Sequence, residues 1–516
     1  MVLGRSCKED FGFVCKGLPA DNEHEGKEYC VLHCPSVDKD QAEFEEAVEK
    51  KVKDKDFDFR GVYFPGWQSL APFRISTLPN GTFEELADFS DATFKERAVF
   101  SRATFKKMAH FDRSTFEGEA NFLNGTFEGL ATFHDAIFKE SATFSDATFK
   151  ELATFHGAIF EGQAILESDR KAIFGYATFK GKADFSRATF KELAVFSRAT
   201  FEELADFDRA TFEEVNFYRA TFKGEADFSG ATFEEVSFED VTFEEEAYLD
   251  RTTFKREAYF RGPETFSRVA DFQFARIEKP ELFSFHRGRL RPSWFINVDP
   301  RRFDFTEVQW PGQPGGPKVT LDDEIRSLQN RNIQASYNPY ILLAQACRRL
   351  SANAEDNREY PIANEFHYWS MDAVRKGSWN HLKDLSLRAL LKKETWYDIG
   401  EHFDLITTLY WALSGYGVRA TRAFWILFAI WLMFAALYFL LVKSSPFWVF
   451  AAPDIWQGID YARQAAVYSL SALVRLNPRP QSEELNWFQT LVTVEGILGP
   501  LQIALLVLAI RRKVMR

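Results

Sequence analysis

Residues 92–102 of the chain read ATFKERAVFSR, and residues 188–198 read almost the same string, ATFKELAVFSR. The chain has 516 residues, 55 of them Phe, and from Phe83 to Phe160 the steps between successive Phe residues alternate between six and five. The unit is therefore eleven residues long, and a fixed period is the signature of a repeat architecture. The aromatic excess excludes a disordered chain, and 28 Gly are too few for collagen.

Each unit places Ala two positions before Phe twice, as in Ala92-Thr93-Phe94 and Ala98-Val99-Phe100. Residues i and i+2 lie on one side of an extended strand but not of a helix, which excludes the eleven-residue helical coil. Thr and Phe also favour strands. Each half unit therefore predicts a short strand with Ala and Phe inward and polar residues at the corners.

These units resemble the pentapeptide-repeat family, in which a small residue stands two positions before a large central apolar one. The resemblance covers residues 57–310 and implies a right-handed, four-sided β-helix with Phe in the place of the usual Leu. One residue, such as Leu86, is inserted between alternate pentapeptides, and the insertion is absent between Phe212 and Phe217. We therefore expect the inserted residue to form a corner bulge. We also expect the Phe rings to stack in columns, with successive coils about 4.8 Å apart.

The repeat predicts architecture and says little about function. No nucleophile–base pair or phosphate-binding glycine loop is present in the sequence, so we expect no enzyme. Three histidines follow no fixed repeat position, and we interpret them as surface variations: His110, His134 and His156.

The charge of the chain is acidic, with a formal net charge of −12. Residues 201–260 hold 17 Asp and Glu against 6 Lys and Arg. A duplex-binding protein would show a basic patch, so nucleic acid is not an expected partner. The local excess has three interpretations: a solvated solenoid face, a docking surface for a basic protein, or a DNA mimic, as some soluble pentapeptide-repeat proteins are. The membrane segments below argue against the mimic.

Four of the five cysteines lie in residues 1–37, a predicted small module. Residues 1–10 lack an apolar core, so we expect a cytosolic N-terminus, where clustered cysteines more often bind metal than form disulfides. The donors are those that tetrahedral Zn²⁺ prefers: Cys7, Cys15, Cys30, His33 and Cys34. Unligated reduced cysteines and a redox role are the alternatives.

The stretch from Tyr29 to Pro35, YCVLHCP, resembles a leader module that precedes pentapeptide repeats in bacterial proteins. The resemblance implies a closed structural zinc site with Cys7, Cys15, Cys30 and His33 as ligands. Cys34 stands where an acidic residue is expected, which leaves the fourth ligand open. A hydrophilic stretch, residues 38–56, links this module to the solenoid.

A helical connector is expected over residues 320–410, after a Pro- and Gly-rich break at residues 311–317. Apolar residues recur at three and four positions from Tyr340 to Leu350, and a second helix is expected over residues 361–376. The pair resembles one tetratricopeptide hairpin, which predicts a coupling or oligomerising role. Cys347 lies on its apolar face and is expected in the core.

A membrane domain is expected over residues 416–516. Residues 423–442 are twenty uncharged residues, and residues 488–510 form a second apolar run with one acid; both are long enough to span a bilayer. Arginines and lysines flank both runs, at Arg419, Arg422 and residues 511–513. We expect a multi-pass protein of the bacterial inner membrane. The positive-inside rule places its N-terminal bulk and its C-terminus in the cytoplasm.

Between the two spans, residues 461–474 form an apolar run that is too short to span. This order resembles the pore domain of two-transmembrane potassium channels, with residues 461–474 as the re-entrant helix. Residues 494–500, VEGILGP, resemble the inner helix of bacterial members, where Glu-x-x-x-Gly is frequent. The resemblance implies a homo-oligomer, by analogy a tetramer. The candidate pore residues are Ser469, Ser471, Arg475, Asn477, Glu495 and Gly499.

Glu495 has two interpretations. An acid inside a membrane span is costly and is by default a functional candidate. Alternatively, its carboxylate anchors the re-entrant segment by hydrogen bonds.

The segment in the place of the filter departs from the potassium channels. Their Thr-Val-Gly-Tyr-Gly loop replaces the hydration shell with carbonyls, whereas residues 474–479 read VRLNPR. We therefore predict no potassium selectivity. A ring of Arg475 would repel cations and favour anions, or the pore has degenerated into an anchor. The leading hypothesis is a channel-like protein with a cytosolic solenoid as sensor; the alternative is a membrane-tethered scaffold that recruits a basic partner.

Overall fold

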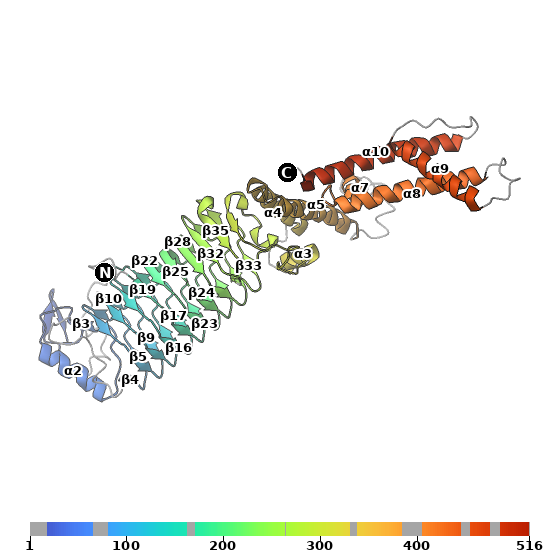
Figure 1. Cartoon of the computed structure of the whole chain (residues 1–516). Helices are drawn as coiled ribbons and strands as arrows, with labels where there is room; N and C mark the ends of the chain where they lie inside the picture. Colours follow the sequence, from blue (N-terminus) through green and yellow to red (C-terminus); the bar gives the residue numbers. More distant parts are fainter. Residues whose placement is uncertain are drawn as a thin grey trace, which may run out of the picture. The chain divides into compact units, whose positions relative to one another are not determined.

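The computed structural model describes residues 18–65, 81–162, 171–263, 265–330, 338–383, 405–444, 455–474 and 486–514. The chain divides into two compact units, Met1–Val319 and Thr320–Arg516. The first is a β-solenoid and the second is helical (Figure 1).

The solenoid is made of short parallel strands that pair with the strands one coil away, as Thr104 and Phe105 pair with Thr126 and Phe127. Four strands make one coil, so the solenoid is four-sided as predicted, while its hand stays a prediction. An eight-stranded sheet forms one side: β4 (Thr82–Phe83), β8 (Thr104–Phe105), β12 (Thr126–Phe127), β16 (Thr148–Phe149), β20 (Thr178–Phe179), β23 (Thr200–Phe201), β26 (Thr221–Phe222) and β29 (Thr242–Phe243).

A nine-stranded sheet forms the next side: β5 (Ala87–Asp88), β9 (Ala109–His110), β13 (Ala131–Thr132), β17 (Ala153–Thr154), β21 (Ala183–Asp184), β24 (Ala205–Asp206), β27 (Ala226–Asp227), β30 (Ala247–Tyr248) and β33 (Ala270–Asp271). A 17-stranded sheet covers the other two sides: β3 (Tyr63–Phe64), β6 (Thr93–Phe94), β7 (Ala98–Val99), β10 (Thr115–Phe116), β11 (Ala120–Asn121), β14 (Ile137–Phe138), β15 (Ala142–Thr143), β18 (Ile159–Phe160), β19 (Lys171–Ile173), β22 (Thr189–Val195), β25 (Thr211–Asn216), β28 (Thr232–Glu239), β31 (Thr253–Phe254), β32 (Ala258–Arg261), β34 (Arg276–Ile277), β35 (Phe283–His286) and β36 (Asp304–Thr306). Three short 3₁₀ helices accompany the last coils: η4 (Pro280–Leu282), η5 (Pro292–Phe295) and η6 (Pro300–Arg302).

The Phe residues point inward and stack in columns along the axis, as the sequence predicts. Phe133 is fully buried, and its ring lies parallel to those of Phe111 and Phe155 at centroid distances of 4.9 and 4.7 Å. Edge-to-face contacts join neighbouring columns, for example between Phe133 and Phe144. Each aromatic pair contributes about 0.5–1.5 kcal/mol beyond the area that it buries, so the columns form the core of the rod.

One corner of each half coil has a left-handed backbone. The residue two positions after every second Phe has a positive φ, as at Arg102 (60°), Arg113 (54°) and Asn124 (56°). This conformation costs a non-glycine residue roughly 1–2 kcal/mol. Hydrogen bonds between coils offset the cost, for example from the amide of Arg113 to the carbonyl of His134 at 2.7 Å.

The inserted residue forms the expected bulge. Strand β22 contains the insertion and pairs with β25, which does not, and their register shifts between Phe190 and Leu193. Where the step is five residues, β25 and β28 run through the corner without interruption and stay in register. The insertion is thus a local corner feature of one fold.

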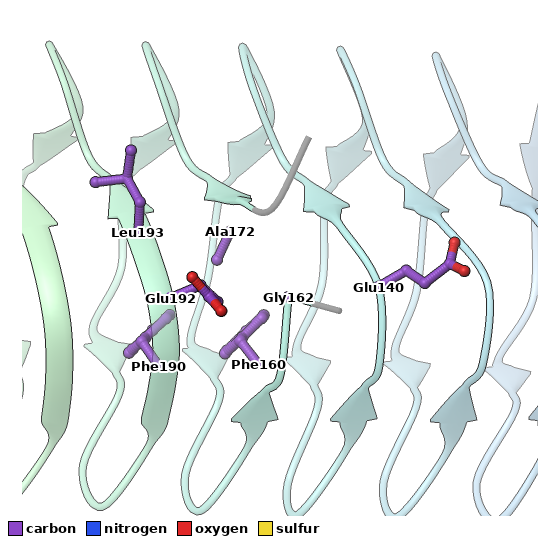
Figure 2. A pocket seen from close by; sticks show the side chains of 7 residues that line it. All are labelled: Glu140, Phe160, Gly162, Ala172, Phe190, Glu192 and Leu193. Atoms are coloured by element: carbon purple, nitrogen blue, oxygen red, sulfur yellow. The ribbon is translucent and has the colours of Figure 1, made fainter. Parts of the chain in front are cut away.

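A longer insertion interrupts the wall once. Phe160 and Phe190 stack at 4.6 Å although they are 30 positions apart instead of 22, so eight additional residues fall between their coils. Figure 2 shows both rings together with Gly162, the last described residue before the insertion, and Ala172, the second residue after the described chain resumes. The hollow beside them has no interior space for a water molecule, so we assign no ligand to it.

The N-terminal end of the solenoid carries a hairpin of β1 (Asn22–His24) and β2 (Lys27–Tyr29) and a helix, α2 (Gln41–Lys53). The hydrophilic stretch 38–56, expected as a link, therefore contains a helix. The Asp40 carboxylate caps it by accepting from the amide of Glu43 at 2.8 Å. Phe44 packs edge-on against Phe64 of the first coils at 5.9 Å. The helix thus covers apolar surface that an end coil would otherwise expose.

The second unit contains seven described helices: α3 (Leu321–Asn330), α4 (Pro339–Asp356), α5 (Tyr360–Lys383), α7 (Leu405–Ser414), α8 (Ala420–Ser444), α9 (Ile455–Leu473) and α10 (Asn486–Val514). Helices α4 and α5 form the predicted hairpin, although α5 continues beyond residue 376. The Ser351 hydroxyl donates to the carbonyl of Ala363 at 2.9 Å across it. Cys347 is fully buried, which confirms its place in the core.

Candidate functional site

The carboxylate of Glu495 is the shared contact of three C-terminal helices. It lies on α10, is fully buried, and accepts a hydrogen bond from the Tyr438 hydroxyl of α8 at 2.7 Å. The Ser469 hydroxyl of α9 donates to its other oxygen. Both oxygens are thus engaged, and one side chain joins three helices that lie side by side in Figure 1.

One helical turn further along, α9 and α10 approach closely at Gly499. A Cβ on Gly499 would stand 2.7 Å from the carbonyl oxygen of Leu473 and 2.9 Å from its Cγ. Glu495 and Gly499 are four residues apart, and so are their partners Ser469 and Leu473, so each pair lies on one helix face. The Glu-x-x-x-Gly motif is therefore the contact surface of α10 for α9.

Helix α9 is also tied to α8. The indole Nε1 of Trp431 donates to the carbonyl of Ala466 at 3.1 Å, and the Ser469 hydroxyl lies 3.2 Å from the carbonyl of Trp431. Phe434, Tyr438 and Ala465 form a buried cluster between the two helices. The middle helix is therefore held by polar and apolar contacts on both sides.

The join before α8 is fixed by Gln502 of α10. Its buried side-chain amide donates to the carbonyls of Leu413 and Ala423, both at 2.9 Å. The chain turns between those carbonyls with a positive φ at Tyr416 and at Gly417, where a Cβ would stand 2.7 Å from Leu508 Cδ2. Tyr416 and Gly417 thus form a tight turn that packs against α10.

The structure brings together three of the six predicted pore residues: Ser469, Glu495 and Gly499. Ser471 is separate, because its hydroxyl donates to the carbonyl of Tyr468 in its own helix at 2.7 Å. Arg475 and Asn477 lie outside the described residues. The sequence does not point to Tyr438, which lies among other aromatic residues. Gln502 could have been identified from the sequence, because it is a polar residue inside an apolar run.

Helices α8 and α10 are long and apolar enough to cross a membrane, over Ala420–Leu440 and Thr490–Arg511. Only 17% of each apolar window is buried, which differs from the core helix of a soluble protein. Large apolar side chains are exposed instead, and patches of this kind mark contact with lipid or protein: Phe424, Trp425, Phe428, Leu432, Ile497, Leu501 and Val507. Helix α9 is not among the two candidate spans, and whether it is re-entrant stays a prediction.

The N-terminal donors are described in part. Cys30, His33 and Cys34 are buried, and the Cys30 Sγ lies 3.1 Å from His33 Nδ1. His33 Nε2 donates to the carbonyl of Arg60 at 2.9 Å, since a carbonyl oxygen can only accept. Metal-bound histidines commonly show this arrangement. Cys7 and Cys15 lie outside the described residues, and the described ones form no group of three donors, so zinc stays a prediction.

The surface charges of the solenoid pair from coil to coil. Lysines and arginines lie beside carboxylates about one coil away, as Lys106 beside Glu84 at 2.9 Å and Lys255 beside Glu234 at 3.1 Å. Such exposed pairs contribute about 0.2–1 kcal/mol each. They neutralise part of the acidic excess in residues 201–260.

Three carboxylates of the nine-stranded sheet lie next to one another: Asp184, Asp206 and Asp227. They stand in register on consecutive coils of the nine-stranded sheet, so carboxylates follow one another in a column. Lys182 pairs with Asp206 at 3.1 Å. Asp227 has no ion pair within the part of the chain that the structure describes.

These features define a β-solenoid with a helical unit in which two helices could span a membrane. The family model described as Pentapeptide repeats (9 copies) matches residues 82–126, 124–168, 174–221 and 217–262. That part of the chain therefore consists of pentapeptide repeats, as the sequence motif indicates. The match covers no residue of the helical unit, so it gives no information about the helices α3 to α10. No curated protein and no solved structure matches the chain.

Proposed function

We propose that the chain is a membrane protein whose C-terminal helices assemble around an axis into an ion-conducting pore. The solenoid is a rigid cytosolic arm that senses or docks a partner. Helices α8 and α10 are the outer and inner helices of each copy, and α9 is the short helix between them. The assembly is a homo-oligomer, a tetramer by analogy with two-transmembrane channels.

The observation that carries this proposal is the contact of Glu495 with Tyr438 and Ser469. Helix α9, which is not a candidate span, is held between two helices that could span a membrane. Its contacts join the run predicted as re-entrant, residues 461–474, to the Glu-x-x-x-Gly motif of α10. This order resembles that of a two-transmembrane channel pore domain, which supports the proposal. It is also the arrangement that the hydrogen-bond-anchor interpretation of Glu495 expects.

Conduction would not be selective for potassium, because residues 474–479 lack glycine and bring two arginines. Purified protein in planar bilayers is expected to conduct. Arg475→Glu should shift the reversal potential toward cations, and Arg276→Glu, an exposed arginine of the solenoid, serves as the charge-matched control. Intact oligomers that carry no current under any tested ion would rule out the channel.

The orientation is part of the same proposal. Arg419 and Arg422 before α8, and residues 511–513 at the end of α10, favour the cytoplasm for both ends. Single cysteines introduced in residues 480–483 are expected to react with a membrane-impermeant reagent added outside spheroplasts. Cysteines introduced in the solenoid should react only after lysis, and the reverse pattern would contradict the orientation.

A second candidate is a non-conducting scaffold tethered to the membrane. The column of Asp184, Asp206 and Asp227 favours it, because like charges one coil apart attract a basic partner. Asp206→Lys with Asp227→Lys should weaken binding of a lysine-rich peptide at physiological salt. The matched control, Glu213→Lys with Glu214→Lys, changes the same charge on the 17-stranded sheet. Equal effects of the two double variants would leave only a general charge effect.

A further inference from the structure

The last coils of the solenoid contain a pocket of about 370 Å³. Its wall includes three arginines and two aromatic residues: Arg268, Arg289, Arg291, Phe266 and Trp294. No acidic residue is among its described lining residues. The volume is in the range of small-molecule sites. This basic pocket is unexpected in a chain with a net charge of −12.

The strand pattern explains why the arginines gather. Leu290 is 1% exposed and points into the core, so its neighbours Arg289 and Arg291 point outward on the same side of an extended segment. The segment is fixed by Gln309, which bridges to Arg289 and whose carbonyl accepts from the amide of Leu290 at 3.1 Å. Arg268 reaches the pocket from the preceding coil, two positions after Phe266.

Arg289 lacks the ion pair that most basic residues of the solenoid make. Most of those pair with a carboxylate about one coil away, and Arg268 itself pairs with Glu245 at 2.5 Å. Arg289 is exposed and makes no ion pair with any residue that the structure describes. A guanidinium that presents its donors without an internal carboxylate is suited to an external anion.

The wall also holds a buried donor. Trp294 is 2% exposed, its ring packs edge-on against Phe266 at 5.5 Å, and its Nε1–H has no hydrogen-bond acceptor among the described residues. Leaving such a group without an acceptor costs about 1–3 kcal/mol.

We propose that this pocket binds a small phosphate-bearing molecule of about mononucleotide size. Arg289 and Arg291 contact the phosphate, because the planar guanidinium forms bidentate, charge-assisted hydrogen bonds with phosphate oxygens. Pro263, Phe266 and Val319 supply apolar surface for the rest of the ligand. The phosphate belongs to a free nucleotide or to a lipid headgroup, since both present the same group to the arginines.

The test uses the full chain in neutral detergent and titrates pyrophosphate, AMP, ATP and a short-chain phosphatidic acid by calorimetry at constant ionic strength. Wild type is expected to bind at least one of the four. Arg289→Gln should weaken that binding at least tenfold. It should leave the fold intact, because the side chain is exposed and has no internal ion pair. The matched control Arg276→Gln removes an exposed arginine of the same region outside the pocket and should bind as wild type.

The arms separate the two sources of phosphate. Binding of AMP or ATP assigns a nucleotide, and binding of phosphatidic acid alone assigns a lipid headgroup. Absence of binding to all four probes would overturn the proposal, and so would an equal loss in Arg289→Gln and Arg276→Gln. The outcome is independent of the proposed pore, because the readout is ligand binding and not current.

Discussion

The carbonyl oxygen of Leu473 lies 2.7 Å from the position that a Cβ on Gly499 would occupy, so α9 and α10 meet at a distance that only glycine allows. Gly496, one turn earlier on α10, has no atom within 4 Å of the same position. The two glycines therefore form a matched pair, one at the helix crossing and one in open space.

Gly499→Ala should destabilise the C-terminal helices by about 1–3 kcal/mol, because the methyl group must push α9 away or force off-rotamer side chains. Gly496→Ala should be neutral or stabilising by up to about 1 kcal/mol, since Ala is the better helix former. Thermal unfolding in detergent, followed by tryptophan fluorescence, measures both. If the two variants melt alike, the close crossing is not formed in solution.

A second pair of variants tests the anchor of Glu495. Ser469→Ala removes a donor to a buried carboxylate and should cost about 1–3 kcal/mol. Ser471→Ala removes a hydroxyl that bonds only within its own helix and should stay within about 0.5 kcal/mol of wild type. The same unfolding measurement in detergent compares them. A larger loss for Ser471→Ala would contradict the contact between Ser469 and Glu495.

The repeat could be read from the sequence because each decision is local. Ala92 and Phe94 are two positions apart, and that spacing alone puts both inside, whatever the rest of the chain does. Helix α2 could not be predicted this way, because its apolar face consists of a few residues such as Phe44, which packs against Phe64 of the first coils. The positive φ of Arg102 also follows from the geometry of the corner and not from its residue type.

The candidate site was predicted in part for a similar reason. Glu495 is the one acid in an apolar run, so its sequence context marks it. Tyr438 is one aromatic residue among many in its span, and only the packing of α8 against α10 selects it as the partner. The pocket at Arg289 could not be predicted, because it depends on which arginines lack a carboxylate in the next coil. Those pairings follow from the register of the last coils, whose lengths are irregular.

The ring columns predict how the solenoid responds to a cavity. Phe133→Ala should destabilise the rod by about 3–5 kcal/mol, because it removes a fully buried ring that stacks on two others. Phe133→Leu keeps an apolar side chain of the kind usual in pentapeptide repeats and should cost clearly less. Far-ultraviolet circular dichroism during denaturation gives both values. Equal losses would contradict this and mean that the stacked ring itself, and not apolar bulk, decides stability at this position.

The zinc prediction has its own test. The purified chain should contain about one equivalent of zinc by mass spectrometry, and Cys30→Ser should abolish it, since Cys30 and His33 already lie together. Cys347→Ser is the matched control, because that thiol is buried in the helical unit. Metal-free wild-type protein with full thermal stability would favour unligated cysteines.

Glu117 predicts a pH dependence of the solenoid. Burial raises the pKa of its carboxyl, but hydrogen bonds from Lys95 and Lys139 on the two adjacent coils outweigh burial and lower the pKa below its ordinary value of 4.5. A lowered pKa in the folded state gives stability above the unfolded pKa, and this is lost as the pH falls through the folded value. Glu117→Gln should therefore cost about 0.5–1 kcal/mol at neutral pH.

The difference between Glu117→Gln and wild type should disappear below the folded pKa, where both side chains are uncharged. Denaturant unfolding at a series of pH values measures it. The control is Glu96→Gln, because the Glu96 carboxylate makes no ion pair with any described residue. The stability of this variant should follow that of wild type across the pH series. A difference for Glu117→Gln that persists in acid would mean that the lysines contribute through packing and not through charge.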